Sequence, residues 1–177
     1  MTDAKEYGKA LFLITEEDGV TEQVLADVKT AKSVFKANPD YAKLLNSPAI
    51  ASAERVELVG KALSGLDERL CNLIKILTEK RSVHLFDKAA EAYLDLYDES
   101  RGILRVEAVT AIPLTEAQSA AIVKKLSVSL GKTVIIKNTV DRAILGGVKL
   151  RYADVQLDGS VKTRLDKFEE ALKSTVI

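Results

Sequence analysis

The sequence predicts a mostly α-helical protein that ends in a small α+β part. Apolar residues recur with the 3.6-residue period of an amphipathic helix up to about residue 100. From residue 103 the period changes to two, which is the spacing of a half-buried strand. Short links join the helical stretches, as in a compact bundle. We therefore expect an N-terminal six-helix bundle over residues 1–101, followed by a small C-terminal α/β sheet domain over residues 102–177.

The first three expected helices follow one another closely. The second begins at Thr21, whose hydroxyl can cap it. The third begins at Asn38-Pro39, a capping residue followed by proline at the first helical position, where the missing N–H costs nothing. Ser47-Pro48 ends the third helix. The first helix carries an apolar stripe that consists of Tyr7, Ala10, Leu11 and Ile14.

Three more helices complete the expected bundle. The fourth runs from about Ser52 to a stop at Gly65. The fifth covers residues 66–80, and the sixth begins near Ser82 and ends at Gly102, so it joins the two halves. The apolar line of the fifth helix consists of Leu66, Leu70, Leu73 and Leu77.

The C-terminal half alternates strand and helix signals. Pro113 ends the first strand, and TEAQ at residues 115–118 is a capping box that opens a helix to Leu130. The runs TVIIKNTV, GVKLRY and VQL predict three more strands. The residues expected on one face of the first strand are Leu104, Val106, Ala108, Thr110 and Ile112. A last helix, from about Ser160, is expected to face the sheet with Val161, Leu165, Phe168 and Leu172.

Composition and charge favour a soluble protein without a nucleic-acid partner. The chain has 177 residues, and its 26 basic and 26 acidic side chains cancel. The start MTDAKEYGKALF has neither the layout of a secretory signal nor that of a transit peptide. No apolar stretch approaches the roughly 20 residues that a membrane-spanning helix needs. We expect any membrane association to go through a partner.

Two glycine-containing stretches imitate phosphate-binding loops. Gly131-Lys132-Thr133 matches the end of a P-loop, but Leu126 stands where that pattern needs its first glycine. The stretch also follows a helix and precedes a strand, the reverse of a P-loop. Gly146-Gly147 precedes a strand, whereas a dinucleotide fingerprint opens a helix. Neither stretch predicts a nucleotide cofactor.

Residues 144–160 instead indicate the corner of a small sheet. Glycine at the start of a strand usually marks a bulge or a close backbone approach. Asp158-Gly159-Ser160 supplies a tight turn and then a helix N-cap. We expect structural roles for Gly147, Asp158, Gly159 and Ser160.

The residue combinations of common catalytic and metal sites are missing. One histidine, His84, and one cysteine, Cys71, are too few for a zinc site, and no nucleophile elbow is present. Cys71 lies in the apolar run LCNLIKIL, where it is expected to be a small buried hydrophobe. A lysine or carboxylate active site carries no signature and stays open. We expect no cofactor, no metal and no catalytic activity of the chain by itself.

The first and fifth expected helices are apolar on more than one side. Phe12 and Leu13 lie off the stripe of the first helix, and Cys71 and Ile76 lie off the line of the fifth. A surface helix in a small bundle needs only one apolar stripe. Either both helices are central, or each keeps one face for the core and offers the other to a partner. Two such helices side by side would form a groove for an amphipathic helix.

Taken in order, the segments resemble a known family. EYGKALF, NPDYAKLLNSPAI, NLIKILTEKR, GILRVEAVTAIPLTEAQ and VDRAILGGVKLRYADVQLDGSVKTRL look like the delta subunit of F-type ATP synthase, the oligomycin-sensitivity-conferring protein family. The similarity covers nearly the whole chain, and residues 140–165 are its most specific part.

The resemblance implies a non-catalytic stator subunit of the proton-translocating F-type ATP synthase. In that family the helical bundle binds the N-terminal helix of an alpha subunit on the catalytic head. The smaller C-terminal domain binds the C-terminal region of the b subunits, the peripheral stalk. One copy per complex resists the torque of the rotor. The implied location is peripheral, at the cytoplasmic face of the bacterial cell membrane or, alternatively, on the stromal side of the plastid thylakoid.

The resemblance also implies which residues bind the alpha subunit. They are Tyr7, Ala10, Leu11 and Ile14 from the first helix and Asn72, Leu73 and Ile76 from the fifth. Gly8 stands where many relatives have alanine, which slightly lowers local helix propensity. Two other hypotheses stay open: an unrelated two-domain helical adaptor that binds some other amphipathic helix, and a nucleotide-binding enzyme.

Overall fold

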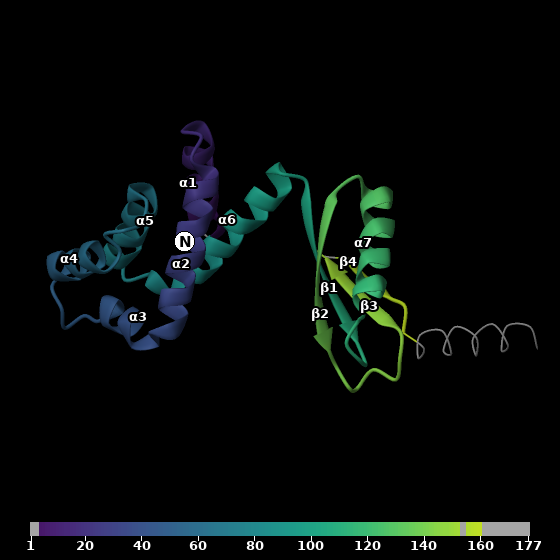
Figure 1. Ribbon diagram of the computed structural model, residues 1–177. Helices are drawn as coiled ribbons and strands as arrows, with labels where there is room; N and C mark the ends of the chain where they lie inside the picture. The colour runs from purple at the N-terminus through teal and green to yellow at the C-terminus, as the bar shows by residue number, and fades with distance from the viewer. Residues whose placement is uncertain (1–3, 153–154, 161–177) are drawn as a thin grey trace, which may run out of the picture. The chain divides into compact units, whose positions relative to one another are not determined.

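The computed structural model describes residues 4–152 and 155–160. Along the described chain, helices α1–α6 come before the first strand, and α7 connects the first strand to the second (Figure 1). The chain divides into two compact units, the first ending at Tyr97 and the second beginning at Asp98. The described part is therefore mostly helical, with a small sheet in the second unit. None of its helices is long and apolar enough to cross a membrane.

The helices of the first unit lie close to where the apolar period predicts them. One 3₁₀ turn, η1, separates α5 from α6, so the last helix of the unit begins at Phe86 and not near Ser82. The bounds are α1 (Ala4–Glu17), α2 (Thr21–Ala37), α3 (Pro39–Asn46), α4 (Ser52–Ala62), α5 (Glu68–Glu79), η1 (Val83–Leu85) and α6 (Phe86–Ser100).

Tyr93 of α6 lies at the centre of the core of this unit. It is fully buried, and its ring packs edge-on against Phe12 with the centroids 5.9 Å apart. Its hydroxyl donates to the carbonyl oxygen of Thr21 over 3.1 Å and lies 3.1 Å from the hydroxyl oxygen of Thr15. One buried side chain thus links α1, α6 and the start of α2. The other large, fully buried apolar residues are Val24, Val28, Leu45, Val59, Leu70, Ile74 and Leu77.

Two predicted capping roles are wrong. Val20, not Thr21, holds the N-cap position of α2, and the Thr21 hydroxyl donates to the carbonyl oxygen of Thr15 over 3.2 Å. Asn38 does precede α3, but its side-chain nitrogen donates back to the carbonyl oxygen of Val34 over 3.0 Å. Short polar side chains have several backbone partners within reach, so sequence alone does not choose among them.

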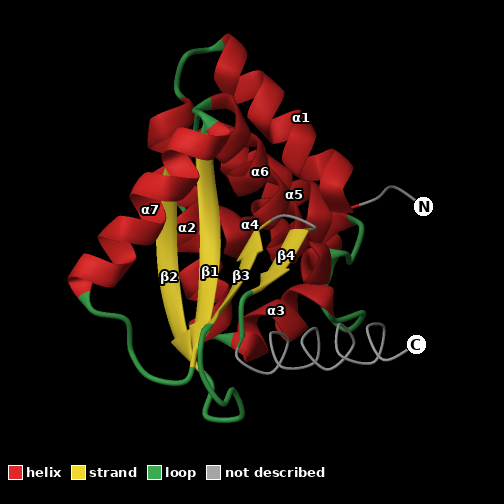
Figure 2. Cartoon of the chain, turned by 90° about the vertical axis from the view of Figure 1, so that its right-hand side faces the viewer, coloured by secondary structure: helices red, strands yellow, loops and turns green. Residues whose placement is uncertain are grey.

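The second unit is a four-stranded mixed sheet with one described helix against it. The strands lie in the order β2-β1-β3-β4 (Figure 2). β1 and β2 are parallel and are joined by α7, whereas the β1–β3 and β3–β4 pairs are antiparallel. The bounds are β1 (Ile103–Thr110), α7 (Glu116–Leu130), β2 (Thr133–Val140), β3 (Val148–Tyr152) and β4 (Val155–Asp158). The last helix that the sequence predicts lies outside the described residues.

The predicted signals around α7 are largely confirmed. Thr115 and Gln118 form the capping box, and Gly131 ends the helix in the left-handed conformation, with φ at 65°. Gly131 is thus a helix stop before β2 and not part of a phosphate loop. Ile112 is a wrong assignment, because β1 ends at Thr110 and the Ile112 side chain is 73% exposed.

Candidate partner-binding surfaces

Helices α1 and α5 lie antiparallel and are tied together at both ends. Asp18, just after α1, accepts from Arg69 in the first turn of α5, with 2.6 Å between the Oδ2 and Nη2 atoms. At the other end, the Nζ atom of Lys80 lies 3.2 Å from the Tyr7 hydroxyl and 5.6 Å from the centre of the Tyr7 ring. These two contacts hold the helices in one register along their length.

Between these ties, both helices carry exposed residues that include two isoleucines. Ile14 is 49% exposed and Ile76 is 42% exposed. Ala10 and Asn72 are also exposed, and Tyr7 is half-buried. We name Tyr7, Ala10, Ile14, Asn72 and Ile76 together the α1/α5 surface. Burying one isoleucine side chain fully stabilises a complex by about 1.5–3 kcal/mol, so covering these half-exposed ones contributes about half as much each.

Leu11 and Leu73, which were expected in the same set, belong to the core. Their exposed fractions are 4% and 9%. Helix α1 buries Gly8 and Thr15 beside Leu11, and neither residue counts as apolar in a periodicity search. The core side of α1 is therefore rotated relative to the predicted stripe. Of the four residues off the predicted stripes, Phe12 and Cys71 are buried, whereas Leu13 is 53% and Ile76 is 42% exposed. Each helix thus keeps a core face and also exposes apolar side chains.

The glycine pair of the second unit lies at a corner of the sheet. Gly147 has φ at 87°, a conformation that disfavours any side chain. The Gly159 N–H donates to the carbonyl oxygen of Val148 over 3.0 Å, and a Cβ atom at Gly159 would lie 3.1 Å from that oxygen. Asp158 accepts from the Ser160 N–H over 2.8 Å and pairs with Lys149 over 3.1 Å. Ser160 itself is buried. These contacts connect β4 to the start of β3.

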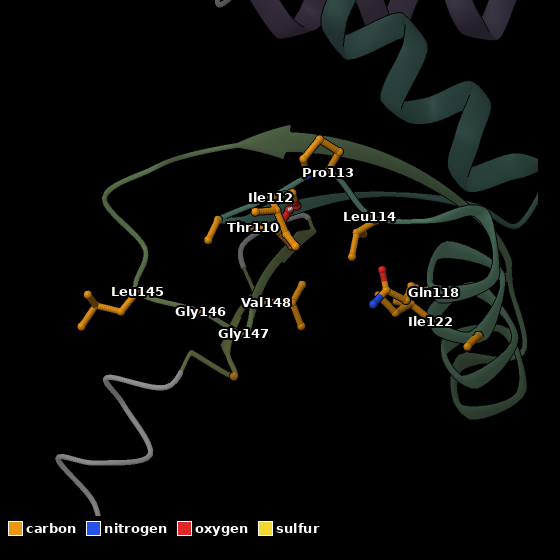
Figure 3. Close-up of a pocket in the computed structure, with 13 residues that line it drawn as sticks. Thr110, Ile112, Pro113, Leu114, Gln118, Ile122, Leu145, Gly146, Gly147 and Val148 are labelled. Atoms are coloured by element: carbon orange, nitrogen blue, oxygen red, sulfur yellow. Dashed lines mark hydrogen bonds between the residues drawn. The ribbon is translucent and has the colours of Figure 1, made fainter.

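An open pocket of about 660 Å³ adjoins this corner. Thr110 and Val148 of the sheet and Gln118 and Ile122 of α7 line it (Figure 3). None of its described lining residues is charged, so the pocket suits an apolar side chain better than a phosphate. The remaining lining residues are Ala111, Ile112, Pro113, Leu114, Ala121, Leu145, Gly146, Gly147 and Gly159.

Comparison with known proteins shows where this architecture belongs. The family model described as "ATP synthase delta (OSCP) subunit" matches residues 4–172. The chain belongs to the ATP synthase delta (OSCP) subunit family. The resemblance predicted from the sequence is thereby confirmed, and with it a place in the F-type ATP synthase.

Two relatives in this family match over almost their entire length. The chain is 33% identical to ATP synthase subunit delta of Clostridioides difficile (strain 630) over 175 residues, which cover 98% of this chain and 97% of the relative. It is 32% identical to ATP synthase subunit delta of Leuconostoc citreum (strain KM20), over 96% of this chain and 94% of the relative. A chain in the cryo-EM structure of the Toxoplasma gondii mitochondrial ATP synthase hexamer shares the fold, with a TM-score of 0.74 at 22% identity over 97% of this chain and 98% of that one.

Sequence reasoning missed Asn138, which shapes the wall of the pocket in this delta-family chain. Its side-chain nitrogen donates to the Ala108 carbonyl oxygen over 2.9 Å and to the Thr110 hydroxyl oxygen over 2.8 Å. Its side-chain oxygen accepts from the Leu114 N–H over 2.8 Å. Asn138 thus joins β2 to the end of β1 and to the loop before α7. The contacts span up to 30 residues of sequence, so no local pattern could reveal them.

The lone cysteine is a packing residue. Cys71 is 8% exposed, and its thiol donates to the carbonyl oxygen of Leu63 over 3.2 Å. Burial raises the pKa of the Cys71 thiol. The prediction of a small buried hydrophobe is confirmed. No cluster of potential metal ligands occurs among residues 4–152 and 155–160.

Proposed function

We propose that this chain is a non-catalytic stator subunit, which joins the alpha subunit of the ATP synthase head to the b subunits of the peripheral stalk. Family membership supports its place in the complex. The observation that carries the proposal is the α1/α5 surface. There Ile14 and Ile76 remain half-exposed, whereas Leu11 and Leu73 of the same helices are buried in the core. We treat α1–α6 as one six-helix bundle that binds the head, and residues 102–177 as the domain that binds the stalk.

The α1/α5 surface suits the apolar face of a partner helix. Ala10 is small and exposed, which lets a helix approach closely, and Ile14 of α1 and Ile76 of α5 are each half-exposed. Tyr7 and Asn72 supply polar atoms at its edge. An amphipathic helix that buries anchors at three- and four-residue spacing uses such a surface. The proposed occupant is the N-terminal helix of an alpha subunit.

The pocket of the second unit suits an apolar anchor from the stalk. Ile112 and Leu145 line it and are 73% and 81% exposed, so both can gain burial from a partner. The proposed occupant is the C-terminal region of a b subunit. Gly147 and Gly159 line the pocket and shape the corner of the sheet beside it. Their backbone conformations would therefore maintain the shape of the stalk-binding pocket.

A stator joint works through tight binding and not through chemistry. One copy per complex must resist the torque that the rotor exerts on the catalytic head, because a slipping head would not make ATP. Such affinity comes from a few well-buried anchors. The chain then associates with the membrane only through the complex, at the cytoplasmic face of a bacterial membrane.

A pull-down with two synthetic peptides tests the proposal on the full chain. One peptide is the alpha N-terminal helix and the other is the b C-terminal region of the same organism. We expect both to bind. Binding of neither peptide would favour an unrelated helical adaptor. Protection of the chain from thermal unfolding by ATP and magnesium would favour a nucleotide-binding enzyme, and we expect no such protection.

A further inference from the structure

One face of the sheet in the second unit carries exposed cations that the proposed function does not use. Lys137 of β2 and Arg151 of β3 each lie directly opposite Glu107 of β1 in the strand register. Directly opposed residues share a face of the sheet. Both cationic side chains are exposed. With Arg105 and Ile135 they line a shallow depression of about 320 Å³, and no residue of α7 lines it.

The charges of the described residues on this face do not cancel. Arg105 is paired with Asp98, with one contact between Nη2 and Oδ1 of 2.9 Å. The Glu107 carboxylate accepts from the Thr139 hydroxyl over 2.9 Å and lies between the two cations. Neither Lys137 nor Arg151 forms an ion pair with a carboxylate of the described residues. Lys149 on the same face is paired with Asp158. Among the described residues, two cations without an ion pair, Lys137 and Arg151, therefore stand against one carboxylate, and the half-exposed Ile135 lies on β2 near Lys137.

We propose that this face, the Lys137/Arg151 face, binds an acidic amphipathic helix of a partner protein. Lys137 and Arg151 stand two strands apart, about 10 Å at the usual strand spacing. Two turns of an α-helix rise about 10.8 Å, so a helix that crosses the strands presents carboxylates seven residues apart to both cations. Ile135, which is 43% exposed, lies on β2 opposite Arg105, to one side of the line from Lys137 to Arg151, and an apolar residue on that flank of the helix covers it.

The arrangement selects a protein helix over a nucleic acid or an anionic membrane. A phosphate backbone or a lipid surface presents closely spaced negative charge, and the central Glu107 repels it. A helix with two carboxylates seven residues apart places no negative charge over Glu107 and matches the flanking cations. The Lys137/Arg151 face shares no residue with the α1/α5 surface or with the pocket beside α7. A test of this proposal is therefore independent of a test of the proposed function.

An NMR titration of the isotope-labelled full chain with two model peptides tests the proposal. Both peptides are helical, about 21 residues long, and identical except at two positions seven residues apart. One peptide has glutamate at these positions, and the other has glutamine. We expect the glutamate peptide to shift the amide signals of Lys137, Glu107 and Arg151 and to bind several-fold more tightly than the glutamine peptide. An absence of shifts, equal affinities, or shifts confined to Ile112 and Leu145 would overturn the proposal.

Charge-removing variants give the second test. Lys137→Gln and Arg151→Gln should each weaken binding of the glutamate peptide by about twofold to fivefold, the range for an exposed ion pair. The matched control is Lys124→Gln, which removes an exposed cation from α7. It should leave the affinity unchanged. An equal loss in the control variant would mean that only overall charge is sensed, and the proposed face would be wrong.

Discussion

At the scale of single residues, Gly8 lies at a very close contact between α1 and α6. A Cβ atom at Gly8 would lie 2.2 Å from the carbonyl oxygen of Ala89 and 2.8 Å from the Cβ atom of Ala92. The carbonyl oxygen is backbone and cannot rotate away. Sequence reasoning treated Gly8 as a small loss of helix propensity, whereas the structure shows it as the residue that permits the helix contact.

We predict that Gly8→Ala lowers the free energy of unfolding by about 1–3 kcal/mol. The cost of overpacking exceeds the gain in helix propensity, which is about 1 kcal/mol or less. Urea unfolding measures the change. The matched control is Gly60→Ala in α4, where the nearest atom to an added Cβ lies 4.0 Å away. That variant should be more stable by about 0.5–1 kcal/mol. Stabilisation by both substitutions would show that α1 and α6 do not meet at Gly8.

The buried thiol gives a prediction about reactivity. Cys71 should react with iodoacetamide far more slowly in the native chain than in urea, because burial removes access and raises the thiol pKa. Alkylation followed by mass spectrometry measures both rates. Similar rates in the two conditions would contradict the buried position of Cys71.

The same shift in the Cys71 pKa predicts a pH dependence of stability. Because the folded pKa is the higher one, the contribution of Cys71 is fully present below the pKa of the unfolded thiol, about 8.5. It is lost as pH rises from there through the folded pKa. Urea unfolding at pH 7 and pH 9.5 should show a smaller loss of stability for Cys71→Ala than for the parent chain. An identical loss in both proteins would contradict the shift.

At the scale of elements, we expect α7 to depend strongly on the caps at its ends. None of its 15 residues is fully buried, so packing contributes less than for the helices of the first unit. We predict that Thr115→Ala costs about 1 kcal/mol, because it removes the acceptor for the Gln118 N–H. Ser129→Ala, at an exposed site in the last turn, should be neutral or slightly stabilising. Equal effects of the two variants on urea unfolding would exclude a stabilising cap.

Helix positions were predictable because apolar spacing and capping signals are local. The capping box at Thr115 and the stop at Gly131 are examples, since all their atoms lie within a few residues. The core side of α1 was not predictable in the same way, because it includes Gly8 and Thr15, which become core only through α6. Arg55 is a similar case. It is 1% exposed and donates to the Ser47 carbonyl oxygen over 2.8 Å, whereas sequence alone predicts that an arginine is exposed.

Strand pairing was only partly predictable. A helix between two strands favours the parallel pairing of β1 with β2, as the structure shows. The order β2-β1-β3-β4 depends on the β1–β3 pairing, which joins residues 38 to 44 positions apart, from Thr110 with Val148 to Glu107 with Arg151, and no local signal encodes it. The pocket beside α7 was missed for this reason, because Ile112 and Leu145 come together only in the folded sheet.

At the scale of the whole molecule, the proposed function depends on a surface that two tied helices keep open. The Asp18–Arg69 and Tyr7–Lys80 contacts hold α1 against α5, and Ile14 and Ile76 stay half-exposed between them. The family resemblance placed both isoleucines in the expected binding set, and Ile76 is also one of the apolar residues off the predicted stripes. Sequence reasoning misplaced Leu11 and Leu73, because periodicity does not distinguish a buried apolar residue from an exposed neighbour one helical step away.

The most direct test is a titration of the full chain with the alpha N-terminal helix peptide, comparing the parent with Ile14→Asp and Ile76→Asp. Each substitution would place an unpaired charge in the proposed contact, so we predict at least a tenfold loss of affinity for each. The control is Val128→Asp, at an 80% exposed apolar site on α7, and its affinity should equal that of the parent. Unchanged affinity of the Ile14→Asp and Ile76→Asp variants would contradict the α1/α5 surface as the head-binding site.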